Sequence, residues 1–289
     1  MKKHILLFGA SGLLGTELLE VLNENGHVVL SPSHKELDLS EPTAIEAYIA
    51  KADVHVIINT AALINVELLE KDPLPGWQIN TVAAGAIARA AARRPGTVLI
   101  HMSTQYVFDG SKPACDEDDL LAPINTYGCT KAAAESVIRQ YCEVSGIRYH
   151  IVRTSWIYAS KRPTFVDQVA DTLRAGKKFE ASVDQYGNPT SGREVANVLL
   201  KNFVETPGQS GIFHVVNNTP EEGVSRYEIA KEIAHIIHAS ESLVMQTKSN
   251  TIFSAKRPSI ALINSKLTPL RDWREALREH IEKKEEKSL

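Results

Sequence analysis

Short apolar runs alternate with longer amphipathic segments along the first half of the chain. The runs suit strands buried on both faces of a parallel sheet, and the segments between them have the apolar spacing of helices packed on that sheet. The predicted strands are residues 5–8, 27–30, 54–59, 97–102 and 148–153. The predicted helices include residues 16–22, 77–93 and 127–145. The pattern therefore predicts an α/β fold with a doubly wound parallel sheet.

The first predicted strand leads directly into a glycine-rich turn, Gly9-Ala-Ser-Gly12-Leu-Leu-Gly15, and a helix follows. In such a unit Gly9 allows a tight turn, Gly12 lets the backbone approach a pyrophosphate, and Gly15 allows close packing. Three glycines in an ordinary loop are the alternative, but the flanking strand and helix favour a dinucleotide site in a Rossmann-type fold. The expected cofactor contacts in this turn are Gly9, Ser11, Gly12, Leu13, Leu14 and Gly15.

The end of the second predicted strand carries no carboxylate. In NAD-selective sites an Asp or Glu there binds the ribose hydroxyls. Here His34 and Lys35 follow instead and can meet a 2′-phosphate, which favours NADPH over NADH, although exposed basic residues are often only solvated. Asp38 and Leu39 are expected to contact the adenine edge, unless Asp38 only caps the next turn.

Small and polar residues follow the third and fourth predicted strands, at the edge of a parallel sheet where ligands bind. The third strand ends at Asn59, and Ala61 and Ala62 are expected to pass beneath the cofactor. The fourth strand delivers Ser103 and Thr104 to the same edge. The sequence therefore predicts a site along the carboxyl ends of the strands.

Tyr127 and Lys131 lie four residues apart in a predicted helix, so their side chains share one face. A free phenol has a pKa of about 10, and we expect the ammonium to lower the pKa of Tyr127 toward neutrality. Such a tyrosine can protonate the alkoxide that forms when hydride reaches a ketone. Thr104 can donate to the same oxygen, whereas Ser103 is the weaker candidate and suits a strand-end hydrogen bond.

The alternation of strand and helix loosens beyond residue 157, where proline and glycine interrupt shorter segments. This predicts a smaller C-terminal lobe interwoven with the last units of the sheet. We expect a dinucleotide-binding domain of residues 1–157 and 188–217, and a substrate-binding lobe of residues 158–187 and 218–289. Loop 109–119 and the mixed-charge end 280–289 are predicted to be solvated surface.

The composition favours a small-molecule partner over nucleic acid or a membrane. Of 289 residues, 43% are hydrophobic and 23% charged, and a net charge of -3 gives no electrostatic footprint for nucleic acid. Cys115, Cys129 and Cys142 lack the spacing of a disulfide framework or a zinc site. The run 5–8 is too short for a signal peptide and no run reaches the ~18 residues of a membrane span, so we expect a cytoplasmic protein.

Nine segments spread over nearly the whole chain carry a family resemblance. They are Gly9-Ala-Ser-Gly-Leu-Leu-Gly15, Glu36-Leu-Asp-Leu39, Asn59-Thr-Ala-Ala62, Ser103-Thr-Gln-Tyr-Val-Phe-Asp-Gly110, Tyr127-Gly-Cys-Thr-Lys131, Arg153-Thr-Ser-Trp-Ile-Tyr158, Asp184-Gln-Tyr-Gly-Asn-Pro-Thr190, Gly211-Ile-Phe-His214 and Arg257-Pro258. With them the chain resembles the extended short-chain dehydrogenase/reductases, and among these the dTDP-4-dehydrorhamnose reductase family.

The resemblance implies a catalytic triad of Thr104, Tyr127 and Lys131. It also implies that Tyr127 and Lys131 contact the cofactor, with Lys131 holding the nicotinamide ribose. It implies hydride transfer from NADPH, or from NADH, to the C4 ketone of a dTDP-4-dehydro-6-deoxy sugar. It also implies substrate contacts from Thr104, Gln105 and Trp156, although core packing is the alternative for Trp156.

Four positions depart from the family pattern. They are Gln105 for Asp, Leu63 for an aromatic residue, Thr164 for Asn and Arg226 for Trp. Because an amide cannot ionise, we expect Gln105 in place of Asp to change the substrate contacts more than the hydride step. Some members bind magnesium through acidic residues that are missing from 251–256, and His235 and His238 lack a third ligand, so we expect no metal.

Two alternatives to this reductase stay open. One is another sugar-nucleotide epimerase or reductase on the same scaffold; a dehydratase is disfavoured because Gln105 stands where those enzymes use an acidic pair beside the threonine. The other is a non-catalytic NADP-binding regulatory subunit like the β subunit of methionine adenosyltransferase, against which the intact Thr104, Tyr127 and Lys131 count. The sequence leaves a homodimer and the exact sugar nucleotide undecided.

Overall fold

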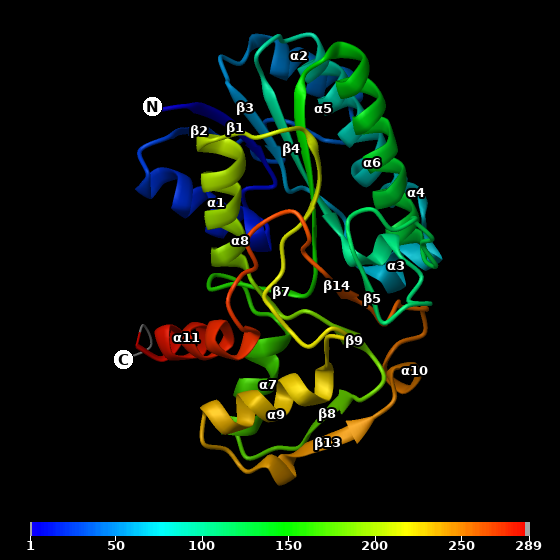
Figure 1. Ribbon diagram of the computed structural model, residues 1–289, viewed down its shortest axis with the longest axis vertical. Helices are drawn as coiled ribbons and strands as arrows, with labels where there is room; N and C mark the ends of the chain where they lie inside the picture. Colours follow the sequence, from blue (N-terminus) through cyan, green and yellow to red (C-terminus); the bar gives the residue numbers. More distant parts are fainter. Residues whose placement is uncertain (1, 287–289) are drawn as a thin grey trace.

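A six-stranded parallel sheet forms the centre of the computed structural model, which describes residues 2–286 (Figure 1). Its strands are β1 (His4–Phe8), β2 (Val28–Leu30), β3 (Val56–Asn59), β4 (Val98–Thr104), β6 (Arg148–Thr154) and β11 (Gly211–His214). Their order is β11-β6-β4-β3-β1-β2, so the chain runs from β1 outward to β2 and then crosses back to β3. Ligands of open α/β sheets bind outside the carboxyl ends of the strands at such a reversal.

Helices cover both faces of the sheet (Figure 1). One face carries α2 (Pro42–Lys51), α5 (Ala83–Ala92) and α6 (Thr126–Ser145), and the other carries α1 (Leu13–Glu24), α8 (Gly192–Val198) and the π-helical η3 (Leu199–Glu205). Alternate side chains of β1 pack against the two helix layers: Leu6 and Phe8 lie in the core on the α2, α5 and α6 side, and Ile5 and Leu7 in the core on the α1 and α8 side. The predicted doubly wound α/β fold is confirmed.

The predicted helices are present with small changes in their bounds. The segment predicted as one helix over 77–93 consists of α4 (Leu74–Gly76), the π-helical η1 (Trp77–Val82) and then α5. A short helix, α3 (Val66–Lys71), precedes it. Helix α6 begins one residue before its predicted start at 127, and Asn125 caps it: its side chain accepts a hydrogen bond of 2.8 Å from the backbone N–H of Gly128.

A smaller lobe lies below the sheet in Figure 1. Its elements are β7 (Ile157–Tyr158), α7 (Phe165–Arg174), β8 (Phe179–Ser182), β9 (Tyr186–Gly187), β10 (Thr190–Ser191), β12 (Val224–Ser225), α9 (Arg226–Ile236), η4 (Glu241–Leu243), β13 (Val244–Thr247), α10 (Ser249–Ile252) and α11 (Trp273–Glu286). Val169, Leu173, Ile229 and Ile233 build its core around Trp273. Since α8 and β11 of the sheet domain fall between lobe segments, the lobe is interwoven as predicted, while the residue boundaries stay a prediction.

Two segments predicted as solvated surface are partly buried. In loop 109–119, β5 (Ala114–Cys115) pairs in parallel with β14 (Ala261–Leu262), and the buried Glu117 accepts a 2.9 Å hydrogen bond from the backbone of His214. At the chain end, Ile281 is buried in the lobe core. Local composition missed both because the partners are distant in sequence. Residues 287–289 of the predicted tail lie outside the described residues, and between 2 and 286 no helix is long and apolar enough to cross a membrane.

A buried ion pair fixes α6 against the sheet. Arg153 on β6 donates to both carboxylate oxygens of Glu135 on α6, at 3.0 and 2.8 Å. Ser103 at the end of β4 donates to the same carboxylate, so its predicted strand-end hydrogen bond is present. Both charged side chains are almost fully buried, so each depends on the other to offset its desolvation.

We expect the Arg153→Met variant to lose about 3–5 kcal/mol of unfolding free energy, because Glu135 would be left as an unpaired buried charge. Urea unfolding at pH 7 measures the change. Arg139→Met is the matched control, since its partner Glu143 lies four residues on along the exposed face of the same helix, and it should lose less than about 1 kcal/mol. Equal losses in the two variants would contradict a structural role for the buried pair.

Candidate active site

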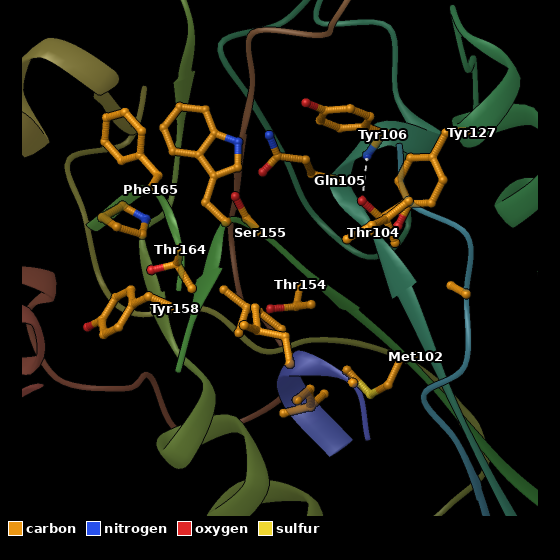
Figure 2. Close-up of a pocket in the computed structure, with 18 of the residues that line it drawn as sticks. Met102, Thr104, Gln105, Tyr106, Tyr127, Thr154, Ser155, Tyr158, Thr164 and Phe165 are labelled. Carbon is orange, nitrogen blue, oxygen red and sulfur yellow. Dashed lines mark hydrogen bonds between the residues drawn. The ribbon is translucent and has the colours of Figure 1, made fainter. Parts of the chain in front are cut away.

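One cavity of about 750 Å³ is lined by both the carboxyl edge of the sheet and the smaller lobe (Figure 2). The predicted site residues that line it are Gly12, Leu13, Leu14, Ala62, Thr104, Gln105, Tyr127, Lys131 and Trp156. The predicted cofactor residues outside this lining are Gly9, Ser11, Gly15, Asp38, Leu39 and Ala61. The structure therefore gathers all the predicted catalytic and substrate-binding side chains in one place, with part of the glycine turn beside them.

The glycine turn is built so that the N-terminus of α1 faces the cavity. Gly9 has φ of +79°, and a Cβ there would lie 2.6 Å from the backbone nitrogen of Ala61. A Cβ on Gly15 would lie 2.0 Å from the carbonyl oxygen of Gly9, so these two glycines allow close packing behind the turn. Gly12 caps α1 and lines the cavity. This arrangement fits a pyrophosphate held at the helix N-terminus.

The predicted adenine-side residues make local contacts. The carboxylate of Asp38 accepts a 2.8 Å hydrogen bond from the backbone N–H of Ser40, and this bond lowers the pKa of Asp38. His34 and Lys35 are exposed. Roles for Asp38, His34 and Lys35 in cofactor selection therefore stay predictions.

Thr104 and Tyr127 lie side by side at one wall of the cavity (Figure 2). The hydroxyl oxygen of Thr104 accepts a 3.3 Å hydrogen bond from the backbone N–H of Tyr106. Burial raises the pKa of Tyr127 to about 12, and a hydrogen bond with Thr104 opposes this rise. The predicted lowering of the pKa of Tyr127 is thus wrong for this structure, because burial dominates and the Lys131 ammonium is bonded to His101. The phenol is held protonated, which is the form that can donate a proton.

Lys131 is buried one helical turn beyond Tyr127. Its Nζ lies 3.0 Å from Nε2 of His101 on β4. Burial lowers the pKa of Lys131 to about 8, and the charge of Glu135 opposes this shift. One face of α6 packs on the sheet and carries three of these side chains, spaced four residues apart: Tyr127, Lys131 and Glu135.

His101 is a site residue that the motif reasoning missed. Burial and the nearby Lys131 lower the pKa of His101 well below its usual range, so the ring is neutral. Its Nδ1 lies 3.2 Å from the side-chain nitrogen of Asn59, whose Oδ1 accepts a 3.1 Å hydrogen bond from the backbone of Ala61. These contacts connect the lysine to the loop after β3. A histidine between the apolar residues Ile100 and Met102 of β4 was the available signal.

Several polar atoms of residues that line the cavity have no protein partner within residues 2–286. Trp156 has φ of +32°, a strained backbone for a bulky residue and a feature common at binding sites. A Cβ on Gly187 would lie 2.9 Å from its ring, which explains the glycine beside it. Within residues 2–286 the buried atoms Gln105 Nε2, Gln105 Oε1, Thr154 Oγ1 and Trp156 Nε1 have no hydrogen-bond partner. Buried polar groups are normally paired, so a polar ligand is expected here.

Arginines also reach the cavity from the lobe, and no motif assigned them roles. Arg162 donates a 3.1 Å hydrogen bond to the carbonyl oxygen of Ser11 in the glycine turn. Arg257 lies 3.2 Å from the carboxylate of Glu67. Arg226 was visible in the sequence only as a departure from the family pattern. All three line the cavity, so its lobe side is positively charged.

Three features surround one cavity: a glycine turn after β1, a Tyr–Lys pair on one helix, and a threonine at the end of a strand. Together they define an extended short-chain dehydrogenase/reductase. The family model described as RmlD substrate binding domain matches residues 1–286. The chain belongs to this family.

Named relatives and solved structures are similar over nearly the full length. A dTDP-4-dehydrorhamnose reductase of Mycolicibacterium smegmatis is 32% identical over 97% of this chain and 86% of its own. A probable dTDP-4,6-dihydroxy-2-methyloxan-3-one 4-ketoreductase of Streptomyces antibioticus is 30% identical over 95% of this chain and 93% of its own. The crystal structure of a dTDP-4-dehydrorhamnose reductase of Bacillus anthracis in complex with NADP has a TM-score of 0.89 and 27% identity, over 98% and 100% of the two chains.

The lowered pKa of Lys131 predicts how stability depends on pH. The folded protein releases this proton near pH 8, whereas the unfolded chain keeps it to about pH 10.5, so the proton penalises the folded state below pH 8 and the penalty disappears as pH rises. From pH 7 to pH 9.5 the unfolding free energy of the wild type should rise by about 2 kcal/mol relative to Lys131→Met. Urea unfolding at both pH values measures this; a constant difference between the two proteins would contradict it.

Proposed function

We propose that this protein is a reductase that transfers hydride from NADPH to the C4 ketone of a dTDP-4-dehydro-6-deoxy sugar. The proposed substrate is dTDP-4-dehydro-L-rhamnose and the product is dTDP-L-rhamnose. The observation that carries the proposal is the pairing of Thr104 with a protonated Tyr127 at the wall of a cavity that the glycine turn also lines. One wall can thus hold a carbonyl oxygen beside a site that fits a dinucleotide.

The residues around the cavity fit a nicotinamide dinucleotide. Gly12 and Leu13 at the N-terminus of α1 would hold the pyrophosphate, and Ala62 would lie along the cofactor. Lys131 would hold the nicotinamide ribose. The cofactor supplies the hydride, which becomes the new C–H bond at C4.

The side chains handle the oxygen and its proton. Tyr127 donates its hydroxyl proton to the C4 oxygen as the carbonyl becomes an alcohol, and Thr104 donates a hydrogen bond to the same oxygen. The phenolate that Tyr127 leaves would then take a proton from solvent. Gln105 and Trp156, whose buried polar atoms have no partner within residues 2–286, would bind the sugar.

The relatives support the choice of substrate and cofactor. The names of the M. smegmatis and S. antibioticus proteins both describe reduction of a dTDP-linked ketone. The similar B. anthracis structure is in complex with NADP. We further propose that residues 1–157 with 188–217 bind the cofactor and that residues 158–187 with 218–289 form the substrate lobe.

Purified wild-type protein should oxidise NADPH when dTDP-4-dehydro-L-rhamnose is added, which the fall of the nicotinamide absorbance measures. Tyr127→Phe should lower kcat by about 10²–10⁴-fold, because the phenyl ring has no proton to donate, while NADPH still binds. Tyr141→Phe is the matched control, since it makes the same change on the same helix outside the cavity lining, and it should keep full activity.

If the wild-type protein binds NADPH without consuming it, the proposed reductase activity is contradicted and a regulatory binding protein is favoured. A fully active Tyr127→Phe would instead remove Tyr127 as the proton donor. Repeating the assay with NADH ranks the two cofactors.

A further inference from the structure

Arg226 is the first residue of α9 and lies between two aromatic rings of the cavity wall. The carbon of its guanidinium is 4.0 Å from the ring centre of Trp156 and 4.5 Å from that of Phe165. Aromatic faces attract a cation, but they do not accept hydrogen bonds from the N–H groups at its edge. The rings therefore hold the guanidinium without satisfying it.

Arg226 has no anionic partner among the described residues. No carboxylate within residues 2–286 forms an ion pair with it, and its buried Nε has no hydrogen-bond partner there. Burial lowers the pKa of Arg226 to about 10; Tyr106 opposes that shift and Arg257 adds to it. The side chain is still charged at neutral pH, so the cavity wall holds a cation without a counter-charge. Such a group is costly unless an anion binds it.

Arg257 provides a second cationic group in the same cavity. Its charge acts on Arg226, so the two lie within electrostatic reach of each other. Glu67 neutralises Arg257 at 3.2 Å, yet the Nε of Arg257 is also buried and has no partner within the described chain. Two guanidinium groups with unused donors fit a ligand with two anionic centres.

We propose that Arg226 binds the diphosphate of the nucleotide sugar, with Arg257 as the second contact. This rests on the proposed function, because it places one part of that substrate in the cavity. A planar guanidinium donates paired hydrogen bonds to phosphate oxygens, and these charge-assisted bonds are about twice as strong as neutral ones. A sugar hydroxyl would leave the charge of Arg226 uncompensated, whereas a diphosphate neutralises it.

The type of side chain at position 226 decides whether this contact can form. An indole has one N–H donor and no charge, so it cannot replace the guanidinium in binding a phosphate. The stacking on Trp156 and Phe165 fixes the arginine in place before the ligand arrives. We therefore assign Arg226 a role in affinity for the diphosphate, separate from proton transfer at Tyr127.

Calorimetric titration of the full-length protein saturated with NADP⁺ tests this assignment, with dTDP and thymidine as the two ligands. R226Q should bind dTDP about 10- to 100-fold more weakly than the wild type, because a charged hydrogen-bond donor is lost. Thymidine has no phosphate, so its affinity should be the same in both proteins, which also shows that the cavity of R226Q is intact. R226W, which keeps an N–H donor but removes the charge, should lose affinity for dTDP in the same way.

Arg274→Gln is the matched control. Arg274 also stacks on a tryptophan, 4.6 Å from the ring centre of Trp273, but it pairs with Glu232 at 3.5 Å and is not part of the cavity lining. R274Q should bind dTDP like the wild type. In high salt the affinity of the wild type for dTDP should fall more steeply than that of R226Q, since one ionic contact has been removed.

Equal binding of dTDP by the wild type and R226Q would overturn the assignment, because the guanidinium would then contribute nothing to the affinity for the diphosphate. No binding of dTDP by the wild type would overturn it as well. A wild-type protein that binds dTDP through Arg226 but does not oxidise NADPH with the dTDP-linked ketone would leave the diphosphate contact standing and defeat only the proposed reductase.

Discussion

The buried pair of Arg153 and Glu135 is the interaction on which the site depends. It ties α6 to β6, and through Ser103 to the end of β4, so the helix has one fixed rotation against the sheet. Because Glu135 continues the stripe of Tyr127 and Lys131, this rotation places the tyrosine beside Thr104 and the lysine beside His101. A buried charge pair is directional in a way that apolar packing is not, which suits a position where catalytic geometry must be exact to fractions of an ångström.

Burial has different effects on the proposed catalytic residues and on the residues expected to bind the substrate. At the sheet edge, burial keeps Tyr127 protonated and lowers the pKa of Lys131. Burial therefore sets the proton affinity of the two side chains beside the proposed proton transfer. At the residues expected to bind the substrate, burial leaves Gln105, Trp156 and Arg226 with polar atoms that no group within residues 2–286 satisfies. Those atoms lower the stability of the free protein and provide binding energy for a polar ligand, the usual compromise at a functional site.

Several features of the structure could not be predicted from the sequence, because their partners are distant along the chain. Loop 109–119 is polar and rich in turn residues, yet it pairs with β14 and buries Glu117 against His214. The pKa of Tyr127 was predicted from helical spacing to Lys131 alone, but spacing does not report burial or the competing contact with His101. His101 itself looked like one polar residue between apolar neighbours, and only the tertiary structure places it between Lys131 on α6 and Asn59 on β3.

The sequence by itself determined the α/β fold, the glycine turn before α1, and the pairing of Tyr127 with Lys131, because these depend on periodicity and on residues close together in the chain. It also identified the threonine at the end of β4 and the family to which the chain belongs. The tertiary structure alone decided which polar groups are buried without partners, which lobe residues line the cavity opposite the sheet edge, and where Arg226 lies. These properties depend on the distances between segments remote in sequence and on exclusion of water, neither of which local patterns contain.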